Sequence, residues 1–132
     1  MVDLAITAMG LSPKVEVLPV EIKRAGNSYT IDTVAELKKI YPDANFTLVL
    51  GSDAANNFDK WHRSEDLLKQ VKILVVSRPG SRATDYDEIN IKALNISSTA
   101  VRESISKRES VSNLLPPKVV TFIREFGLYG SR

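Results

Sequence analysis

Small hydroxyl residues and a cation gather at the start of one predicted helix. The helix is expected near residues 98–107, with Arg102 in its first turn, and it opens with Ser97, Ser98 and Thr99. A helix N-terminus carries about half a positive charge and several free backbone N–H groups. An arginine there is unfavourable unless an anion lies beside it, so the cluster favours phosphate binding. An ordinary N-cap with a solvated arginine explains the same pattern about equally well.

Two further polar clusters follow apolar runs that read as strands. Gly51 and Asp53 come after the run 46–50, where a glycine allows close approach and a carboxylate can accept hydrogen bonds from ribose hydroxyls. Arg78 follows the run 73–76 and can pair with a phosphate. Each cluster alone is more often a structural turn. Ligands of open α/β sheets bind beyond the carboxyl ends of the strands, so three such clusters together favour a nucleotide cleft.

The only tryptophan lies in a polar loop rather than in a periodic apolar segment. Trp61 is flanked by charged residues, which makes it a candidate platform for stacking a flat ring. The alternative, with an equal claim, is an indole folded back over the core with Phe58. His62 is the only histidine and has no evident partner for a metal pair or a Ser-His-Asp arrangement. We expect it to be a surface or supporting residue.

Length and composition limit the class of protein. The 132 residues fit one domain over 1–132, with 43% hydrophobic and 26% charged residues, as in ordinary globular proteins. The formal charge of +2 does not favour a nucleic-acid or membrane-surface partner. No cysteine is present, and no apolar run reaches the roughly 18–20 residues of a membrane span. We expect a cytoplasmic protein without a nucleic-acid or membrane partner.

Alternating elements position these clusters. Helices are predicted over 1–9, from 28 or 30 to 40, over 64–71, 98–107 and 117–126, and strands over 15–22, 46–50, 73–76 and around 89–94. Ser28 or Thr30 is expected to cap the second helix. The runs 46–50 and 73–76 are typical of strands buried on both faces of a parallel sheet. The fold class is therefore α/β with a parallel sheet.

Several motifs together resemble one enzyme family. They are residues 26–33 (Gly-Asn-Ser-Tyr-Thr-Ile-Asp-Thr), 51–53 (Gly-Ser-Asp), 58–62 (Phe-Asp-Lys-Trp-His), 77–80 (Ser-Arg-Pro-Gly), 96–102 (Ile-Ser-Ser-Thr-Ala-Val-Arg) and the closing stretch 114–129. Their order and spacing resemble those of bacterial nicotinate-nucleotide adenylyltransferases over essentially the whole chain. The Ser-Ser-Thr-x-x-Arg element is shared with related nucleotidylyltransferases, whereas the Ser-Tyr-Thr-Ile-Asp-Thr and Trp-His elements are more specific. The resemblance implies a Rossmann-like parallel sheet flanked by helices.

The resemblance also implies an activity in NAD biosynthesis: adenylyl transfer from ATP to nicotinate mononucleotide, giving deamido-NAD and pyrophosphate. In that family, backbone groups around Tyr29 and Thr30 would hold the nicotinate carboxylate, and Trp61 would stack on the pyridine ring. Arg78 would approach the mononucleotide phosphate. Gly51 and Asp53 would lie beside the dinucleotide.

The same resemblance assigns the ATP phosphates to the start of the helix near 98–107. Ser97, Ser98 and Thr99 would cradle the phosphates, and Arg102 would neutralise their charge as the catalytic cation. Mg²⁺ would enter with ATP, and no metal-ligating residue is expected in the protein itself.

One departure from the family is large. The family's His-x-Gly-His element, which binds ATP phosphates, is absent from this sequence. The resemblance places Met1 inside the family's second helix, so we expect the first two strands and the first full helix of the family fold to be missing. The interpretation is a truncated form with weak or no activity alone. Its sheet would expose an edge, which allows self-association into a homo-oligomer.

Two alternatives stay open. The chain could be a non-catalytic nucleotide-binding or interaction module that kept the pyridine site. It could also be an adenylyltransferase for another phosphorylated substrate, such as pantetheine phosphate, although the elements around Tyr29, Thr30 and Trp61 argue against that.

Overall fold

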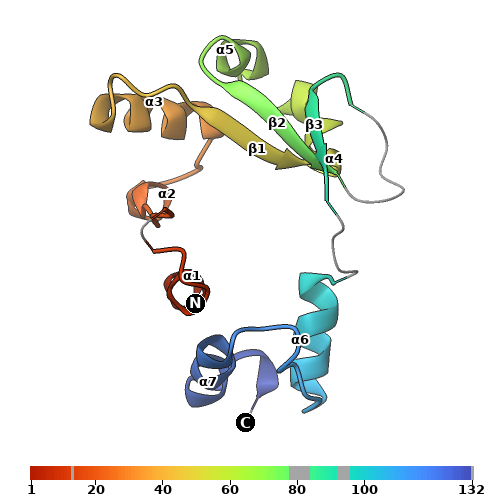
Figure 1. Ribbon diagram of the computed structural model, residues 1–132. Helices are drawn as coiled ribbons and strands as arrows, with labels where there is room; N and C mark the ends of the chain where they lie inside the picture. The colour runs from red at the N-terminus through yellow and green to blue at the C-terminus, as the bar shows by residue number, and fades with distance from the viewer. Residues whose placement is uncertain (13, 78–83, 92–95, 132) are drawn as a thin grey trace. The chain divides into compact units, whose positions relative to one another are not determined.

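The computed structural model describes residues 1–12, 14–77, 84–91 and 96–131 (Figure 1). The chain forms two compact units. One unit, here called the terminal unit, combines Met1–Leu18 with Leu94–Arg132, and the other, the middle unit, is Pro19–Ala93. Each unit has its own hydrophobic core cluster. The single domain expected over residues 1–132 stays a prediction.

The middle unit is built on a three-stranded parallel sheet. The strand order is β1-β2-β3, with β1 at Thr47–Gly51, β2 at Lys72–Ser77 and β3 at Asp87–Asn90. Both pairs of neighbouring strands are parallel. The parallel sheet expected from the alternating sequence pattern is therefore confirmed.

Four helices and a 3₁₀ turn accompany this sheet. They are α2 (Val20–Lys23), α3 (Thr30–Ile40), α4 (Ser52–Ala55), α5 (Ser64–Leu68) and the turn η1 (Phe58–Lys60). Helix α3 buries Ile31 and Val34, three residues apart on one helical face, as the apolar spacing predicted. They join a core that includes the fully buried side chains of Phe58, Leu67 and Val75. Burying each such side chain contributes about 1.5–3 kcal/mol to folding.

Strand β1 is covered on one face only. Leu50 is 8% exposed and belongs to the core, whereas its neighbour Val49 is 57% exposed. Successive side chains of a strand point to opposite faces. The prediction that run 46–50 is buried on both faces is therefore wrong. An uninterrupted apolar run cannot by itself distinguish a strand with two covered faces from one whose second face is open.

The strand predicted over residues 15–22 is also not formed. Residues 15–19 have no regular structure, and Val20–Lys23 form helix α2. Val15 and Val17 are 41% and 40% exposed. Branched residues favour extended backbone, but a strand needs a partner strand for stability. The described sheet contains β1, β2 and β3 alone.

The terminal unit is helical. It consists of α1 (Val2–Ala8), α6 (Ser98–Ser106), α7 (Pro117–Glu125) and the 3₁₀ turn η2 (Leu128–Gly130). Pro117 occupies the first position of α7, where its missing N–H costs nothing. Gly127 follows that helix with φ 61°, the left-handed conformation that commonly ends a helix. The three predicted helices of this part of the chain are confirmed.

Within the described ranges, every helix is too short or too polar to cross a membrane.

Candidate functional site

Two segments predicted to bind the pyridine nucleotide meet in one pocket of the middle unit. The pocket, of about 260 Å³, is lined by Ser28, Tyr29, Thr30, Trp61 and His62. Residues 28–30 lead into helix α3, and residues 61–62 follow the turn η1. The structure therefore brings Tyr29, Thr30 and Trp61 together although they are far apart in the sequence. Ser28 and His62 were not predicted as binding residues.

Trp61 is held by a buried aromatic neighbour. Its ring centroid lies 5.3 Å from that of Phe58, with the planes inclined by 35°. Phe58 is 1% exposed and in turn meets Tyr86 edge-on at 6.0 Å. The packing of Trp61 against Phe58, one of the two alternatives for this residue, is thus present. Because Trp61 also lines the pocket, packing and ligand stacking are compatible.

Tyr29 and His62 form the other aromatic wall. Their rings stack with centroids 4.1 Å apart and planes inclined by 29°. Both residues are exposed, and Asn27 Nδ2 lies 3.5 Å from the hydroxyl oxygen of Tyr29 as a hydrogen-bond donor. His62 therefore acts as a surface residue that supports Tyr29, in line with the expectation for it.

The start of α3 offers backbone donors beside these rings. Tyr29 is the N-cap, and no side chain caps this helix. The prediction that Ser28 or Thr30 caps it is wrong, because the Ser28 hydroxyl instead donates to the backbone oxygen of Glu21 at 3.4 Å. The N–H groups of Thr30 and Ile31, in the first turn, have no partner inside the helix. An α-helix start of this kind favours a carboxylate or phosphate.

One ion pair and two side-chain hydrogen bonds connect the end of α2 with α3. Arg24 donates to the Thr33 hydroxyl at 3.1 Å and pairs closely with Glu36. The Thr33 hydroxyl donates to a carboxylate oxygen of Glu21 at 2.8 Å. These bonds connect α2 with the first turns of α3. They hold together the two ends of the segment that lies between α2 and Tyr29.

The end of β1 leaves room beside its backbone. A Cβ added at Gly51 would meet no atom within 4 Å. The next residue, Ser52, is 6% exposed, and its hydroxyl has no hydrogen-bond partner among the described residues. Buried polar groups normally have a partner, in the protein or in a ligand or water. Asp53 is exposed in the first turn of α4. The backbone at Gly51 is therefore open, and the assignment of Gly51 and Asp53 to a ligand stays a prediction.

The hydroxyl cluster of the terminal unit lies at the start of α6. Ser97 is its N-cap, and its Oγ accepts a hydrogen bond from the backbone N–H of Ala100 at 3.1 Å. Ser98 and Arg102 line one pocket of about 300 Å³, together with apolar side chains such as Ile96. Arg102 and Thr99 are exposed. No hydrogen bond or ion pair of the Arg102 guanidinium is found within the part of the chain that the structure describes.

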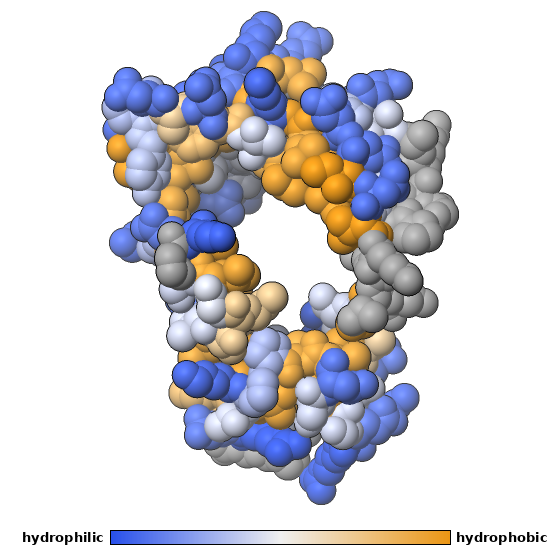
Figure 2. Space-filling model, viewed as in Figure 1, coloured by the Kyte–Doolittle hydropathy of each residue, from blue (hydrophilic) through white to orange (hydrophobic). Residues whose placement is uncertain are grey.

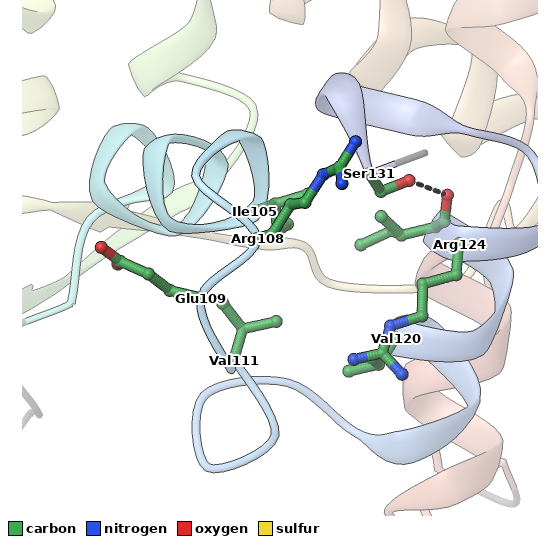
Figure 3. A pocket seen from close by; sticks show the side chains of 8 residues that line it. Ile105, Arg108, Glu109, Val111, Val120, Arg124 and Ser131 are labelled. Atoms are coloured by element: carbon green, nitrogen blue, oxygen red, sulfur yellow. Dashed lines mark hydrogen bonds between the residues drawn. The ribbon is translucent and has the colours of Figure 1, made fainter.

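A more enclosed pocket of about 220 Å³ lies at the other end of α6 (Figure 3). It is lined by Ile105, Arg108, Glu109, Val111, Val120, Ile123, Arg124 and Ser131. Ser131 donates to the backbone oxygen of Ile123 at 2.9 Å. The C-terminal end of α7 carries partial negative charge, which Arg124 in its last turn complements. The pocket contains none of the predicted phosphate-binding residues.

The predicted site residues fall into two sets. Tyr29, Thr30, Gly51, Asp53 and Trp61 belong to the middle unit, and Ser97, Ser98, Thr99 and Arg102 belong to the terminal unit. Arg78 lies outside the described residues. Its neighbour Ser77, at the end of β2, is 1% exposed and donates to Asn90 Oδ1 on β3 at 2.5 Å.

Comparison with known proteins identifies the family. A cytidylyltransferase-like family model matches residues 2–104. A protein of Oceanobacillus iheyensis assigned as a nicotinate-nucleotide adenylyltransferase is 40% identical over 133 residues, spanning 98% of this chain and 68% of the relative. The chain belongs to the nicotinate-nucleotide adenylyltransferase family. A Geobacillus thermodenitrificans member is 34% identical, and the chain spans 61% of its length.

Solved structures agree on the fold of this family member. The crystal structure of a protein from Vibrio parahaemolyticus, assigned to the same activity, matches 99% of this chain and 68% of its own with TM-score 0.75 and 24% identity. A Plasmodium falciparum nicotinic acid mononucleotide adenylyltransferase complexed with NaAD matches 82% and 60%, with TM-score 0.67 and 22% identity. The Rossmann-like fold expected from the resemblance is confirmed. The family resemblance drawn from the motifs is confirmed as well.

Proposed function

We propose that this chain carries the nucleotide site for adenylyl transfer from ATP to nicotinate mononucleotide in NAD biosynthesis. The observation that carries the proposal is the pocket in which residues 28–30 meet Trp61 and His62. Its two parts have complementary chemistry: aromatic rings for a flat heterocycle and free helix N–H groups for an anion. Nicotinate combines a flat ring with a carboxylate.

Within this pocket, the backbone around Tyr29 and Thr30 donates hydrogen bonds to the nicotinate carboxylate. Trp61 stacks on the pyridine ring, and Phe58 behind it limits the motion of the indole. Nicotinamide has an uncharged amide in place of the carboxylate, so the helix start favours nicotinate through its partial positive charge. The preference for the acid follows from that difference.

The remaining predicted residues serve the phosphates and riboses. We assign Gly51 and Asp53 to the dinucleotide, Arg78 to the mononucleotide phosphate, and Ser97, Ser98, Thr99 and Arg102 to ATP. In the reaction, a phosphate oxygen of the mononucleotide attacks the α-phosphorus of ATP, and the bond to pyrophosphate breaks. The protein contributes position and charge neutralisation rather than a covalent intermediate.

Mg²⁺ enters this proposal as part of the MgATP substrate. Among the residues that the structure describes, no group of three or more His, Cys, Asp or Glu side chains is placed to hold a metal ion. The groups assigned to the phosphates are hydroxyls, backbone N–H groups and a guanidinium, all of which can donate hydrogen bonds to an anion. We further propose that the protein works in the cytoplasm.

We also propose that the chain alone turns over weakly or not at all. Its sequence lacks a His-x-Gly-His element, because His62 is its only histidine. It spans 68% and 61% of two relatives. Pyrophosphate release should therefore be measured with nicotinate mononucleotide and MgATP. Turnover at ordinary enzyme rates of about 1–1000 per second would contradict weak activity.

Binding can be tested separately from turnover. Trp61 is the only tryptophan and lines this pocket, so its fluorescence reports on binding there. Titration with nicotinate mononucleotide should change the emission and saturate, whereas nicotinamide mononucleotide should bind more weakly. Pantetheine phosphate serves as the comparison substrate. A response to pantetheine phosphate and none to the pyridine nucleotides would contradict the proposal.

A further inference from the structure

The pyridine pocket is made of two segments that are far apart in the sequence. Residues 28–30 and residues 61–62 line it, and both segments belong to the middle unit. Each segment is anchored by a neighbouring core residue, Ile31 for the first and Phe58 for the second, which are 2% and 1% exposed. The core thus fixes the backbone on either side of the pocket, but it does not hold the exposed side chains that line it.

One ring contact joins the exposed side chains of the two segments. Tyr29, 39% exposed, stacks on His62 with ring centroids 4.1 Å apart and planes inclined by 29°. Figure 2 shows apolar surface over the strands of the same unit, where Val49 is 57% exposed. At the pocket, by contrast, each ring shields one face of the other from water, which favours the stacked arrangement.

Each ring of the stack is fixed to its own segment by the backbone. The backbone oxygen of Tyr29 accepts a hydrogen bond from the N–H of Asp32 at 3.0 Å, so Tyr29 is tied to the first turn of α3. His62 lies in a turn closed by a hydrogen bond from the N–H of Ser64 to the backbone oxygen of Trp61 at 3.2 Å. The stack therefore connects the free N–H groups at the start of α3 with the segment that carries the indole.

We propose that His62 is a positioning residue that sets the preference for nicotinate over nicotinamide, an inference that rests on the proposed function. Its stack on Tyr29 holds the N–H groups of α3 at a fixed separation from the indole of Trp61. The carboxylate of nicotinate is bonded directly to the pyridine ring, so the ligand can reach the donors and the indole together only at one separation.

The two ligands depend on this separation to different degrees. Stacking on the indole is common to the acid and the amide, whereas hydrogen bonds to a charged carboxylate are stronger than those to a neutral amide. Loosening the start of α3 relative to Trp61 therefore weakens the acid more than the amide.

Calorimetric titration of the full chain with nicotinate mononucleotide and nicotinamide mononucleotide tests this proposal. His62→Ala should weaken binding of the acid about two- to tenfold, the usual contribution of one aromatic pair, and should lower the ratio of the two affinities. His62→Phe keeps a ring that can stack and should restore both values. Trp61→Ala should weaken both ligands alike and leave their ratio unchanged.

Leu68→Ala is the matched control for a truncated surface side chain. Leu68 is 45% exposed in α5 and does not line the pocket, so its variant should bind both nucleotides as the native chain does. An equal loss in this variant would overturn the proposal.

A measurement without ligand applies if His62→Ala fails to fold. His62 is the only histidine, so its ring protons give a single set of NMR signals. The ring current of Tyr29 should shift these signals upfield, and Tyr29→Leu should remove the shift. Signals that are the same in the native chain and in Tyr29→Leu would overturn the proposal.

The binding results separate this proposal from the proposed function. A native chain that binds neither pyridine nucleotide would overturn both. If the native chain binds the acid, this proposal alone is overturned by an unchanged affinity ratio in His62→Ala, or by a His62→Phe variant as weak as His62→Ala.

Discussion

At the scale of single residues, the position of Trp61 is compatible with both roles considered for it, packing on the core and stacking on a ligand. It rests on the buried ring of Phe58 at 5.3 Å and also lines the pocket with Tyr29 and His62. A stacking residue that is itself packed loses little conformational freedom when a ligand arrives. If Trp61 stacks on the pyridine ring as proposed, the core contact with Phe58 restricts the indole before the ligand binds.

Replacing Trp61 separates these two roles. Trp61→Ala should weaken the binding of nicotinate mononucleotide by about 1–3 kcal/mol, because the stacking surface is lost. Isothermal titration calorimetry measures the change. Trp61→Phe keeps a ring at this position and should retain most of the affinity. Unchanged binding by Trp61→Ala with a lower melting temperature would mean that Trp61 is a packing residue only.

At the scale of elements, the start of α6 depends on one hydrogen bond. Ser97 Oγ accepts from the N–H of Ala100 at 3.1 Å. Ser97→Ala should lower the free energy of unfolding by about 0.5–2 kcal/mol, the usual value of an N-cap. Denaturant unfolding measures it. Thr99→Ala is the control, because Thr99 is the exposed second residue of the helix, two positions after the N-cap, and should change stability much less. An equal loss would contradict the capping role.

Helix α5 carries a pH-dependent contribution. The side-chain hydrogen bond and charge of Arg63, 3.0 Å from Asp66, hold the pKa of that carboxyl below its ordinary value, with a smaller effect from Lys69. A carboxyl with a lower pKa in the folded state stabilises the fold above its unfolded pKa of about 3.9. This stabilisation is lost as the pH falls through the folded pKa.

Asp66→Asn should therefore lose a small amount of stability at neutral pH and show a shallower decrease below about pH 4. Urea unfolding at neutral and acidic pH measures both. Asp85→Asn is the control: Asp85 is exposed, and the described residues offer it no ion pair. The interpretation fails if both variants follow the same pH profile.

Local sequence signals predicted most elements of this chain. Apolar spacing located α3, the Ser-Ser-Thr turn located α6, and Gly127 marked the end of α7. These signals lie within a few residues of the element they define. The failures at residues 15–22 and 46–50 concern partner strands and face coverage, which depend on distant parts of the chain.

The candidate site was also predictable only in part. Motif resemblance identified Tyr29, Thr30 and Trp61, and the structure places them in one pocket. The stacking of His62 on Tyr29 could not be predicted, because ring contacts between segments 33 residues apart in sequence leave no local pattern. The unpartnered hydroxyl of Ser52 likewise became visible only from its burial.

At the scale of the whole molecule, the two compact units divide the predicted ligand contacts. The middle unit holds the pyridine pocket, and the terminal unit holds the hydroxyl cluster and Arg102. If the units bind different parts of the substrates, each should bind its own part independently. Mononucleotide affinity should then survive changes at the start of α6.

The open space at Gly51 allows folding and recognition to be measured apart. Its backbone has φ −76°, which every L-amino acid adopts, and an added methyl group would touch no protein atom. Gly51→Ala should therefore leave the melting temperature unchanged or raise stability by about 0.4–1 kcal/mol. A nucleotide that passes close to this backbone would collide with the methyl group. Its affinity should therefore fall, while the free energy of unfolding of the protein should not decrease. Equal nucleotide affinity of the native protein and the Gly51→Ala variant, measured by calorimetry, would show that the nucleotide does not approach the backbone of Gly51.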